Sequence, residues 1–354
     1  MRIALWQHIK PLVALNDHKR PWGGHITVAL SVGIPLLVGV WLNHFILGIV
    51  VRLGGLSSIY LRQTPLAHRM VTMALVGFGF CVSFTVSSLA GFHPLIMTFV
   101  LFLVAFAATF ISRYFTMPPP GSFFFIMVAC VASAMPYDLA VLPQRIGLIF
   151  IGCMVASSLV LVYSLLQYVT KNTQGIHPGE PTEPRVVAIL LEAATIAVFI
   201  AASYLLAIGL GFDRPYWAPI SCLAVIQGAS FRAVWHRNVH RIVGTALGLG
   251  LAWVMFSFQP SLLALALLVM AISFIAEVLI TRNYGLAVIF VTPLSIIFAE
   301  ASQAVNDINQ VIYLRMVDVV LGSLVGYVGG WVLHKKHYYD RLEQALLKRL
   351  KKAK

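Results

Sequence analysis

The chain has 354 residues, of which 60% are hydrophobic and only 10% are charged. A soluble domain carries about a quarter charged residues, so this chain cannot cover a soluble surface and must have lipid as its main solvent. Its formal net charge of +13 could suggest nucleic acid as a partner. Basic residues are expected in the cytoplasmic loops of inner-membrane proteins, however, and we expect no nucleic-acid binding.

Apolar runs follow one another along the chain, and each is a candidate span because about 20 apolar residues cross a bilayer. The runs lie near residues 26–43, 45–60, 70–90, 94–112, 122–136, 146–168, 186–210, 217–231, 242–257, 260–280, 284–300 and 311–333. They predict an all-α membrane protein of about 12 transmembrane helices. Runs 45–60, 122–136 and 217–231 are short, which leaves open a tilted, broken or re-entrant segment at each. Arg52 inside the first of these weakens that span further.

The basic residues predict the orientation of the spans. If the runs alternate in direction, one side receives both chain ends and most of the basic residues between spans: Arg62, Arg69, Arg113, Lys171, Arg185, Arg232, Arg237, Arg241 and Arg282. By the positive-inside rule this side is cytoplasmic. The sequence therefore predicts a multi-pass protein of the bacterial inner membrane with both termini in the cytoplasm.

An internal repeat is indicated by arginines that recur at similar spacing. Arg145 and Arg315 each precede a glycine by seven residues, and Arg113 and Arg282 each close an apolar run after a hydroxyl residue. The intervals 69 to 113 to 145 and 241 to 282 to 315 agree within about three residues. Six spans per copy is an even number, so the repeats are predicted to be parallel, about an axis along the membrane normal.

The predicted organisation has five parts. They are a cytoplasmic N-terminal segment (1–24), a first six-helix repeat (25–168), a cytoplasmic linker (169–185), a second six-helix repeat (186–334) and a C-terminal segment (335–354). The last part carries leucines three or four residues apart among many basic residues, which predicts an amphipathic helix on the cytoplasmic leaflet. A solvated, frayed tail is the alternative.

The string Arg241-Ile-Val-Gly244-Thr245-Ala-Leu-Gly248, which opens the ninth run, resembles the fusaric acid resistance family. Arg315 to Gly322, followed by further glycines, resembles the last span of that family's unit. The family includes bacterial aromatic acid exporters and is related to the plant aluminium-activated malate transporters. The resemblance implies export of organic acids across the inner membrane, by a short form without the large cytoplasmic domains of longer members.

Arginines are the candidates for an anion route, because a guanidinium matches a carboxylate and charge at membrane depth is costly. The six candidates form two symmetric sets: Arg69, Arg113 and Arg145, and Arg241, Arg282 and Arg315. Topology signalling and snorkelling to lipid phosphates are the alternative roles.

Acidic residues within the spans are candidates for coupling or gating. Asp318 follows Arg315 by three residues, so the two can pair on one helical face, either as structural neutralisation or as a gate. Glu192 and Glu277 could carry a proton, since a desolvated glutamate can hold one near neutral pH.

The sequence favours a transporter that exports small organic anions, with aromatic carboxylic acids among the candidates. A channel-like anion conductor is the alternative, and a membrane scaffold or lipid-modifying protein is a third class. No nucleotide-binding loop, catalytic constellation or metal-ligand spacing stands out, so we expect neither an enzyme nor a cofactor. The expected partners are the organic anion and the lipid bilayer, and a homo-oligomer is left open.

Overall fold

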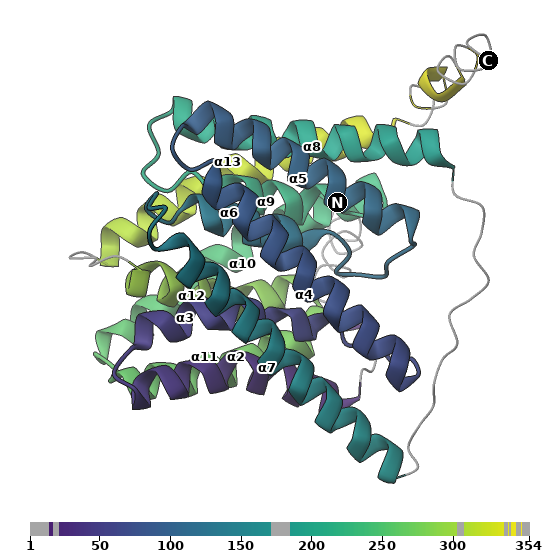
Figure 1. Cartoon of the computed structure of the whole chain (residues 1–354). Coiled ribbons are helices and arrows are strands. Elements are labelled where there is room, and N and C mark those ends of the chain that lie inside the picture. Colours follow the sequence, from purple (N-terminus) through teal and green to yellow (C-terminus); the bar gives the residue numbers. More distant parts are fainter. Residues whose placement is uncertain are drawn as a thin grey trace. The chain divides into compact units, whose positions relative to one another are not determined.

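The computed structural model describes residues 14–16, 21–170, 185–302, 308–335, 339, 341–344 and 348. These residues form helices and turns without a strand (Figure 1). Eight of the described helices are long and apolar enough to cross a membrane. The predicted all-helical membrane architecture is therefore confirmed. Most of the predicted N-terminal segment, linker and C-terminal amphipathic helix lies outside the described residues.

Two compact units make up the chain. Unit 1 comprises Met1–Val82, Asp138–Pro178 and Val239–Met316, and unit 2 comprises Ser83–Tyr137, Gly179–Asn238 and Val317–Lys354. Each unit therefore draws on both halves of the sequence. Three helices contribute residues to both units: α4 (Leu66–Leu89), α10 (Phe231–Ser257) and α13 (Ile308–Leu333).

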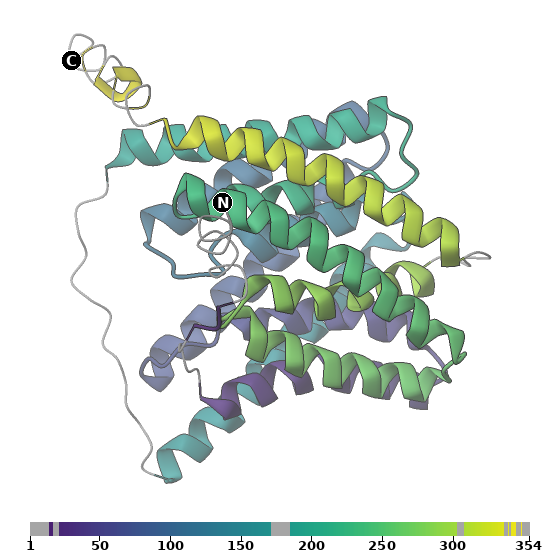
Figure 2. The same cartoon turned by 180° about the vertical axis from the view of Figure 1, so that it is seen from behind.

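The other helices belong to one unit each. Unit 1 holds α2 (Trp22–Trp41), α3 (Phe45–Gly55), the 3-10 helix η1 (Leu56–Tyr60), α7 (Leu142–Val169), α11 (Leu262–Ile280) and α12 (Tyr284–Ser302). Within it α2 packs on α3, α7 and α11, and α11 packs on α12 (Figure 2). Unit 2 holds α5 (Pro94–Tyr114), α6 (Phe123–Ser133), α8 (Val186–Gly209) and α9 (Trp217–Ile226). Here α5 packs on α8, while α9 packs on both α8 and α6.

The three runs that looked short in the sequence are short helices. Helices α3 and α6 have 11 residues each and α9 has 10. At 1.5 Å per residue, each is about 15–17 Å long, roughly half of the hydrocarbon thickness, although α3 continues directly into η1 so that its run is helical from Phe45 to Tyr60. All residues of α9 are buried, as are most of those of α3 and α6. Protein rather than lipid therefore surrounds these helices, which is the condition under which helix ends are tolerated at membrane depth.

Several helices begin earlier than the apolar runs predicted. Helix α10 starts at Phe231 rather than near residue 242, so Arg232, Arg237 and Arg241 lie on its first turns and not in a polar turn. Charged residues end an apolar run, but arginine is a good helix former, and its long side chain can reach polar surroundings from inside a helix. Local chemistry fixes other starts: His93 caps α5 and Ser261 caps α11.

Glycines allow the short helices to approach their neighbours closely. A β-carbon on Gly152 of α7 would overlap the carbonyl oxygen of Val51 in α3. In unit 2, a β-carbon on Gly322 of α13 would overlap the carbonyl oxygen of Ala218 in α9. Close backbone contact through small residues is the main source of helix association in lipid, where burial of apolar surface contributes little.

Pro35 of α2 and Pro293 of α12 lie in helix interiors, and each leaves a carbonyl that is close to a glycine of a neighbouring helix. Proline cannot donate to the carbonyl four residues earlier, which for Pro35 is that of Ser31 and for Pro293 that of Ile289. A β-carbon on Gly55 of α3 would overlap the Ser31 carbonyl, and one on Gly248 would lie 2.6 Å from the Ile289 carbonyl oxygen. Gly248, part of the glycine motif at the start of the ninth run, thus serves helix packing.

Replacing Gly152 by alanine should destabilise the protein, because the new methyl group meets backbone atoms that cannot move independently. Overpacking of this kind costs roughly 1–3 kcal/mol. Gly147→Ala on the same helix is the matched control, since a β-carbon there meets nothing within 4 Å. Thermal unfolding of the purified protein in detergent should show a lower midpoint for Gly152→Ala alone. Equal midpoints for the two variants would contradict the packing described here.

Candidate functional site

Arg69 connects two helices of unit 1. It lies on the first turn of α4, is buried, and donates from Nη1 to Ser164 Oγ (2.9 Å) and Gln167 Oε1 (2.8 Å) on α7. The Gln167 amide in turn donates to the hydroxyl of Tyr163 (2.7 Å). These acceptors are neutral, so the guanidinium keeps its positive charge without a carboxylate among these contacts.

The remaining predicted site residues of unit 1 differ in how far they are buried. Arg241 of α10, Arg315 of α13 and Glu277 of α11 are buried. Arg145 of α7 and Arg282, which follows α11, are partly buried. The carbonyl of Arg282 accepts the backbone N–H of Asn16 (2.9 Å), which attaches the N-terminal segment to the α11–α12 turn.

Asp318 lies on α13 three residues after Arg315, and it is also buried. Residues three apart on a helix share a face, as the sequence predicted for this pair. Each of the two charges would be costly to bury alone.

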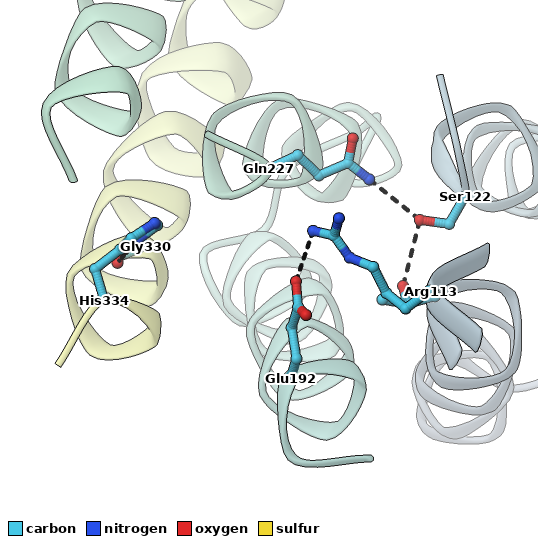
Figure 3. Close-up of polar contacts among 7 residues, drawn as sticks. Arg113, Ser122, Glu192, Gln227, Gly330 and His334 are labelled. Atoms are coloured by element: carbon cyan, nitrogen blue, oxygen red, sulfur yellow. Dashed lines mark hydrogen bonds and ion pairs between the residues drawn. The ribbon is translucent and has the colours of Figure 1, made fainter. Parts of the chain in front are cut away.

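In unit 2, Arg113 and Glu192 form an ion pair. Arg113 Nη2 lies 2.6 Å from Glu192 Oε1, which joins the end of α5 to the start of α8 (Figure 3). The side chains are 50% and 26% exposed, respectively. The sequence nominated one residue for the anion route and the other for coupling, and the structure brings the two together.

A short hydrogen-bonded chain lies beside this ion pair. Gln227, at the end of α9, donates from Nε2 to Ser122 Oγ at the start of α6 (3.2 Å), and Thr109 of α5 donates to the same oxygen (3.4 Å). Figure 3 shows the Arg113 guanidinium directed toward Glu192, and the Gln227 amide directed toward Ser122. Guanidinium, carboxylate, amide and hydroxyl groups converge where α5, α6, α8 and α9 end or begin. We call Thr109, Arg113, Ser122, Glu192 and Gln227 the α5–α8 polar cluster.

Arg237 and His334 bind backbone carbonyls. Arg237 Nη1 on α10 donates to the carbonyl of Ala224 near the end of α9 (3.3 Å), where helix carbonyls lack intrahelical partners. His334 Nδ1 lies 2.8 Å from the carbonyl oxygen of Gly330 on α13. Among the described residues, no group of three His, Cys, Asp or Glu side chains is placed to hold a metal ion.

Arg52 of α3 was not among the candidate site residues predicted from the sequence. Its side chain is only 7% exposed, and among the described residues its Nε and Nη1 atoms have no hydrogen-bond partner. From the sequence, this arginine counted only as evidence against run 45–60 being a full membrane span. A lone charge in an apolar run is by default a functional candidate, because burying it is costly, and that signal was present in the sequence.

The fold thus defines a polytopic α-helical membrane protein with ionisable groups buried in its helices. Residues 196–329 match the family described as fusaric acid resistance protein-like, so the resemblance read from the sequence is confirmed over this part of the chain.

Two curated bacterial proteins are similar to the chain. One is the uncharacterized membrane protein YvaC of Bacillus subtilis (strain 168), 31% identical over 156 residues, which cover 44% of this chain and 25% of the relative. The other is the uncharacterized protein YhfK of Escherichia coli (strain K12), 30% identical over 164 residues, with 44% and 23% covered. The alignments thus span about a quarter of the length of these relatives. No solved structure matches the chain significantly.

Breaking the Arg113–Glu192 pair should leave the fold largely intact. Ion pairs this exposed contribute on the order of 0–1 kcal/mol, so Arg113→Gln should shift the unfolding midpoint only slightly. Arg69→Gln is the comparison: its guanidinium is buried and bonded to α7, so its loss should lower the midpoint clearly. Thermal unfolding of both variants in detergent tests this order. A larger loss for Arg113→Gln would show that the exposed pair carries the fold.

Proposed function

We propose that this protein is a membrane transporter that exports small organic anions, aromatic carboxylates among them, from the bacterial cytoplasm. One observation carries the proposal: the buried charged residues of unit 1 are mostly arginines. Among the described residues of unit 1 these are Arg52, Arg69, Arg241 and Arg315, and the one buried carboxylate there is that of Glu277. Asp318, the next charged residue on α13, is also buried and belongs to unit 2. The match of residues 196–329 to the fusaric acid resistance family supports the same function.

Positive charge buried inside a membrane protein is costly, and it is retained where it serves an ion or substrate pathway. A net excess of buried guanidinium groups favours an anionic cargo over a cationic one. Arginine also presents donors in a plane that can bind both oxygens of a carboxylate. Organic acids therefore fit these residues better than neutral or cationic solutes do.

As part of this proposal, the chain crosses the membrane twelve times and has both termini in the cytoplasm. Contacts within each unit support this topology. In unit 1, Arg69 at the start of α4 bonds to Gln167 near the end of α7. In unit 2, Arg113 at the end of α5 pairs with Glu192 near the start of α8. Alternating spans would place the two partners of each contact on the same, cytoplasmic side.

We also propose that the two halves of the chain are parallel repeats. Related contacts recur six helices apart: Gly152 of α7 packs on Val51 of α3, and Gly322 of α13 packs on Ala218 of α9. Likewise α2 packs on α11, and α8 packs on α5. In this scheme the first, second and sixth helices of one half pack with the fourth and fifth helices of the other.

The α5–α8 polar cluster offers a means of coupling export to protons. Protonation of Glu192 would remove its negative charge and release Arg113 for the carboxylate of a substrate. A substrate carboxylate could equally compete with Glu192 for the same guanidinium. Glu277 and the Arg315–Asp318 pair are the corresponding candidates for coupling and gating in the buried part of the chain.

Flux measurements in proteoliposomes test the function. The purified protein should move labelled hydroxybenzoate, and an imposed pH gradient should accelerate this movement. Malate measured in parallel extends the test to aliphatic acids. Current that reverses at the anion equilibrium potential, without dependence on the proton gradient, would instead favour a channel. If the protein shows neither flux nor current but acts on lipid head groups, both the transporter and the channel are refuted.

Changing Arg145 and Arg315 together to glutamine should abolish flux, because the proposed anion route loses a positive charge from each half. The double variant should still reach the membrane at the wild-type level, which immunoblotting of membrane fractions checks. Arg214→Gln is a suitable control, since this arginine lies in the α8–α9 turn. Wild-type flux in the double variant would remove both arginines from the route.

A further inference from the structure

We propose that Arg52 is the binding residue for the carboxylate of a monocarboxylate substrate inside unit 1. The inference rests on the proposed function and names one residue that contacts the cargo. It starts from an unusual state of this side chain: the guanidinium is buried, yet its Nε and Nη1 have no hydrogen-bond partner among the described residues. Natural proteins pair nearly all buried polar groups, and charged ones above all.

The position of Arg52 is fixed by the packing of α3. Residues 48, 52 and 55 are spaced four and three apart, so they lie on one face of the helix. On this face Gly48 contacts α2, where a β-carbon would lie 2.7 Å from the Pro35 carbonyl oxygen, and Gly55 contacts the Ser31 carbonyl. Arg52 therefore starts from the side of α3 that faces α2, between two glycine contacts that hold the helices at a fixed separation.

A second pair of glycine contacts holds α3 from another side. A β-carbon on Gly54 would lie 2.7 Å from the backbone nitrogen of Cys153 in α7, and Gly152 of α7 meets Val51. With backbones in contact on two sides, α3 cannot shift easily to bring Arg52 to water. The positive charge is thus held inside the protein by rigid packing, as expected of a binding group positioned before its ligand arrives.

The surroundings of Arg52 indicate which anion it would bind. The α2 residues beside its two flanking glycines include Val32 and Leu36, which are buried and apolar, and the buried Ile49 lies three residues before it on α3. One guanidinium neutralises one negative charge, and two parallel N–H donors match the two oxygens of a carboxylate. An anion with a single carboxylate and an apolar body fits these conditions. A doubly charged, strongly hydrated anion such as phosphate would keep an uncompensated charge in apolar surroundings.

The burial of Arg52 also bears on how the substrate arrives. Nε and Nη1 are inaccessible to solvent in the structure, so the carboxylate must reach them in a conformation that differs from this one. The described state is then the one without substrate, in which the positive charge is enclosed. A ligand that binds another conformation shifts the population toward it.

The test compares ligand binding with stability in the full-length protein. Arg52→Met removes the charge and keeps the length of the side chain. Because Nε and Nη1 have no hydrogen-bond partner to lose among the described residues, this variant should unfold at the wild-type temperature or above it. Benzoate should raise the unfolding temperature of the wild type, and Arg52→Met should lose this rise and bind benzoate about tenfold or more weakly. Arg62→Met, a change at a partly buried arginine that follows η1, should bind benzoate like the wild type.

Two further measurements complete the test. Arg52→Lys keeps the charge but lacks the planar donors, so it should fold normally and bind benzoate at an intermediate strength. Inorganic phosphate and malate should bind the wild type more weakly than benzoate does. Benzoate binding to Arg52→Met at wild-type strength, no benzoate binding to the wild type, or equal binding of phosphate and benzoate would each overturn the inference.

The same variants separate this inference from the proposed function. If the wild type binds benzoate through Arg52 but moves no anion in proteoliposomes, export is refuted and the binding site stands. If the wild type transports benzoate and Arg52→Met both binds and transports it equally well, export stands and the inference fails.

Discussion

Helices half as long as the bilayer is thick can persist in a membrane only if protein encloses their ends, because lipid offers no hydrogen bonds to the free N–H and C=O groups there. Helices α3, α6 and α9 meet this constraint by being packed inside their units. Glycines allow the neighbouring helices to pack closely against them: Gly152 lies against the backbone of α3, and Gly322 lies against the backbone of α9. The longer helices pack around the short ones. In this packing Ser122 at the start of α6 and Gln227 at the end of α9 come close enough to form a hydrogen bond.

Most of the helices could be predicted from hydropathy, because most apolar runs are long and all are bounded by charge or turns. The first residues of the helices were harder to predict. Helices α4 and α10 begin before their apolar runs, because residues such as Arg69 and Arg241 interrupt an apolar run without interrupting a helix. Which helices pack against each other could not be predicted from the sequence. Arg113 and Glu192 meet because α5 packs on α8, and a single sequence with one apolar helix after another does not specify which helices touch.

The candidate residues illustrate the same limit. Hydropathy marked Arg52 as an anomaly, but only the structure shows that it is buried and that, among the described residues, its Nε and Nη1 have no hydrogen-bond partner. Arg69 was predicted as one of a symmetric set of anion-route residues, and the structure adds that its hydrogen bonds to Ser164 and Gln167 connect α4 to α7. An unsatisfied buried charge also lowers stability, a cost commonly found where function requires a strained or open group.

The assignment of helices to the two units has a consequence for biogenesis. Unit 1 needs α2 and α3 from the beginning of the chain and α11 and α12 from near its end. During synthesis the early helices enter the bilayer long before the partners that cover them have left the ribosome. The face of α2 that α11 finally covers must meanwhile be shielded by lipid, by the insertion machinery or by a chaperone. Folding of this protein is therefore expected to finish only after translation of the last helices, and a ribosome stalled midway would leave neither unit complete.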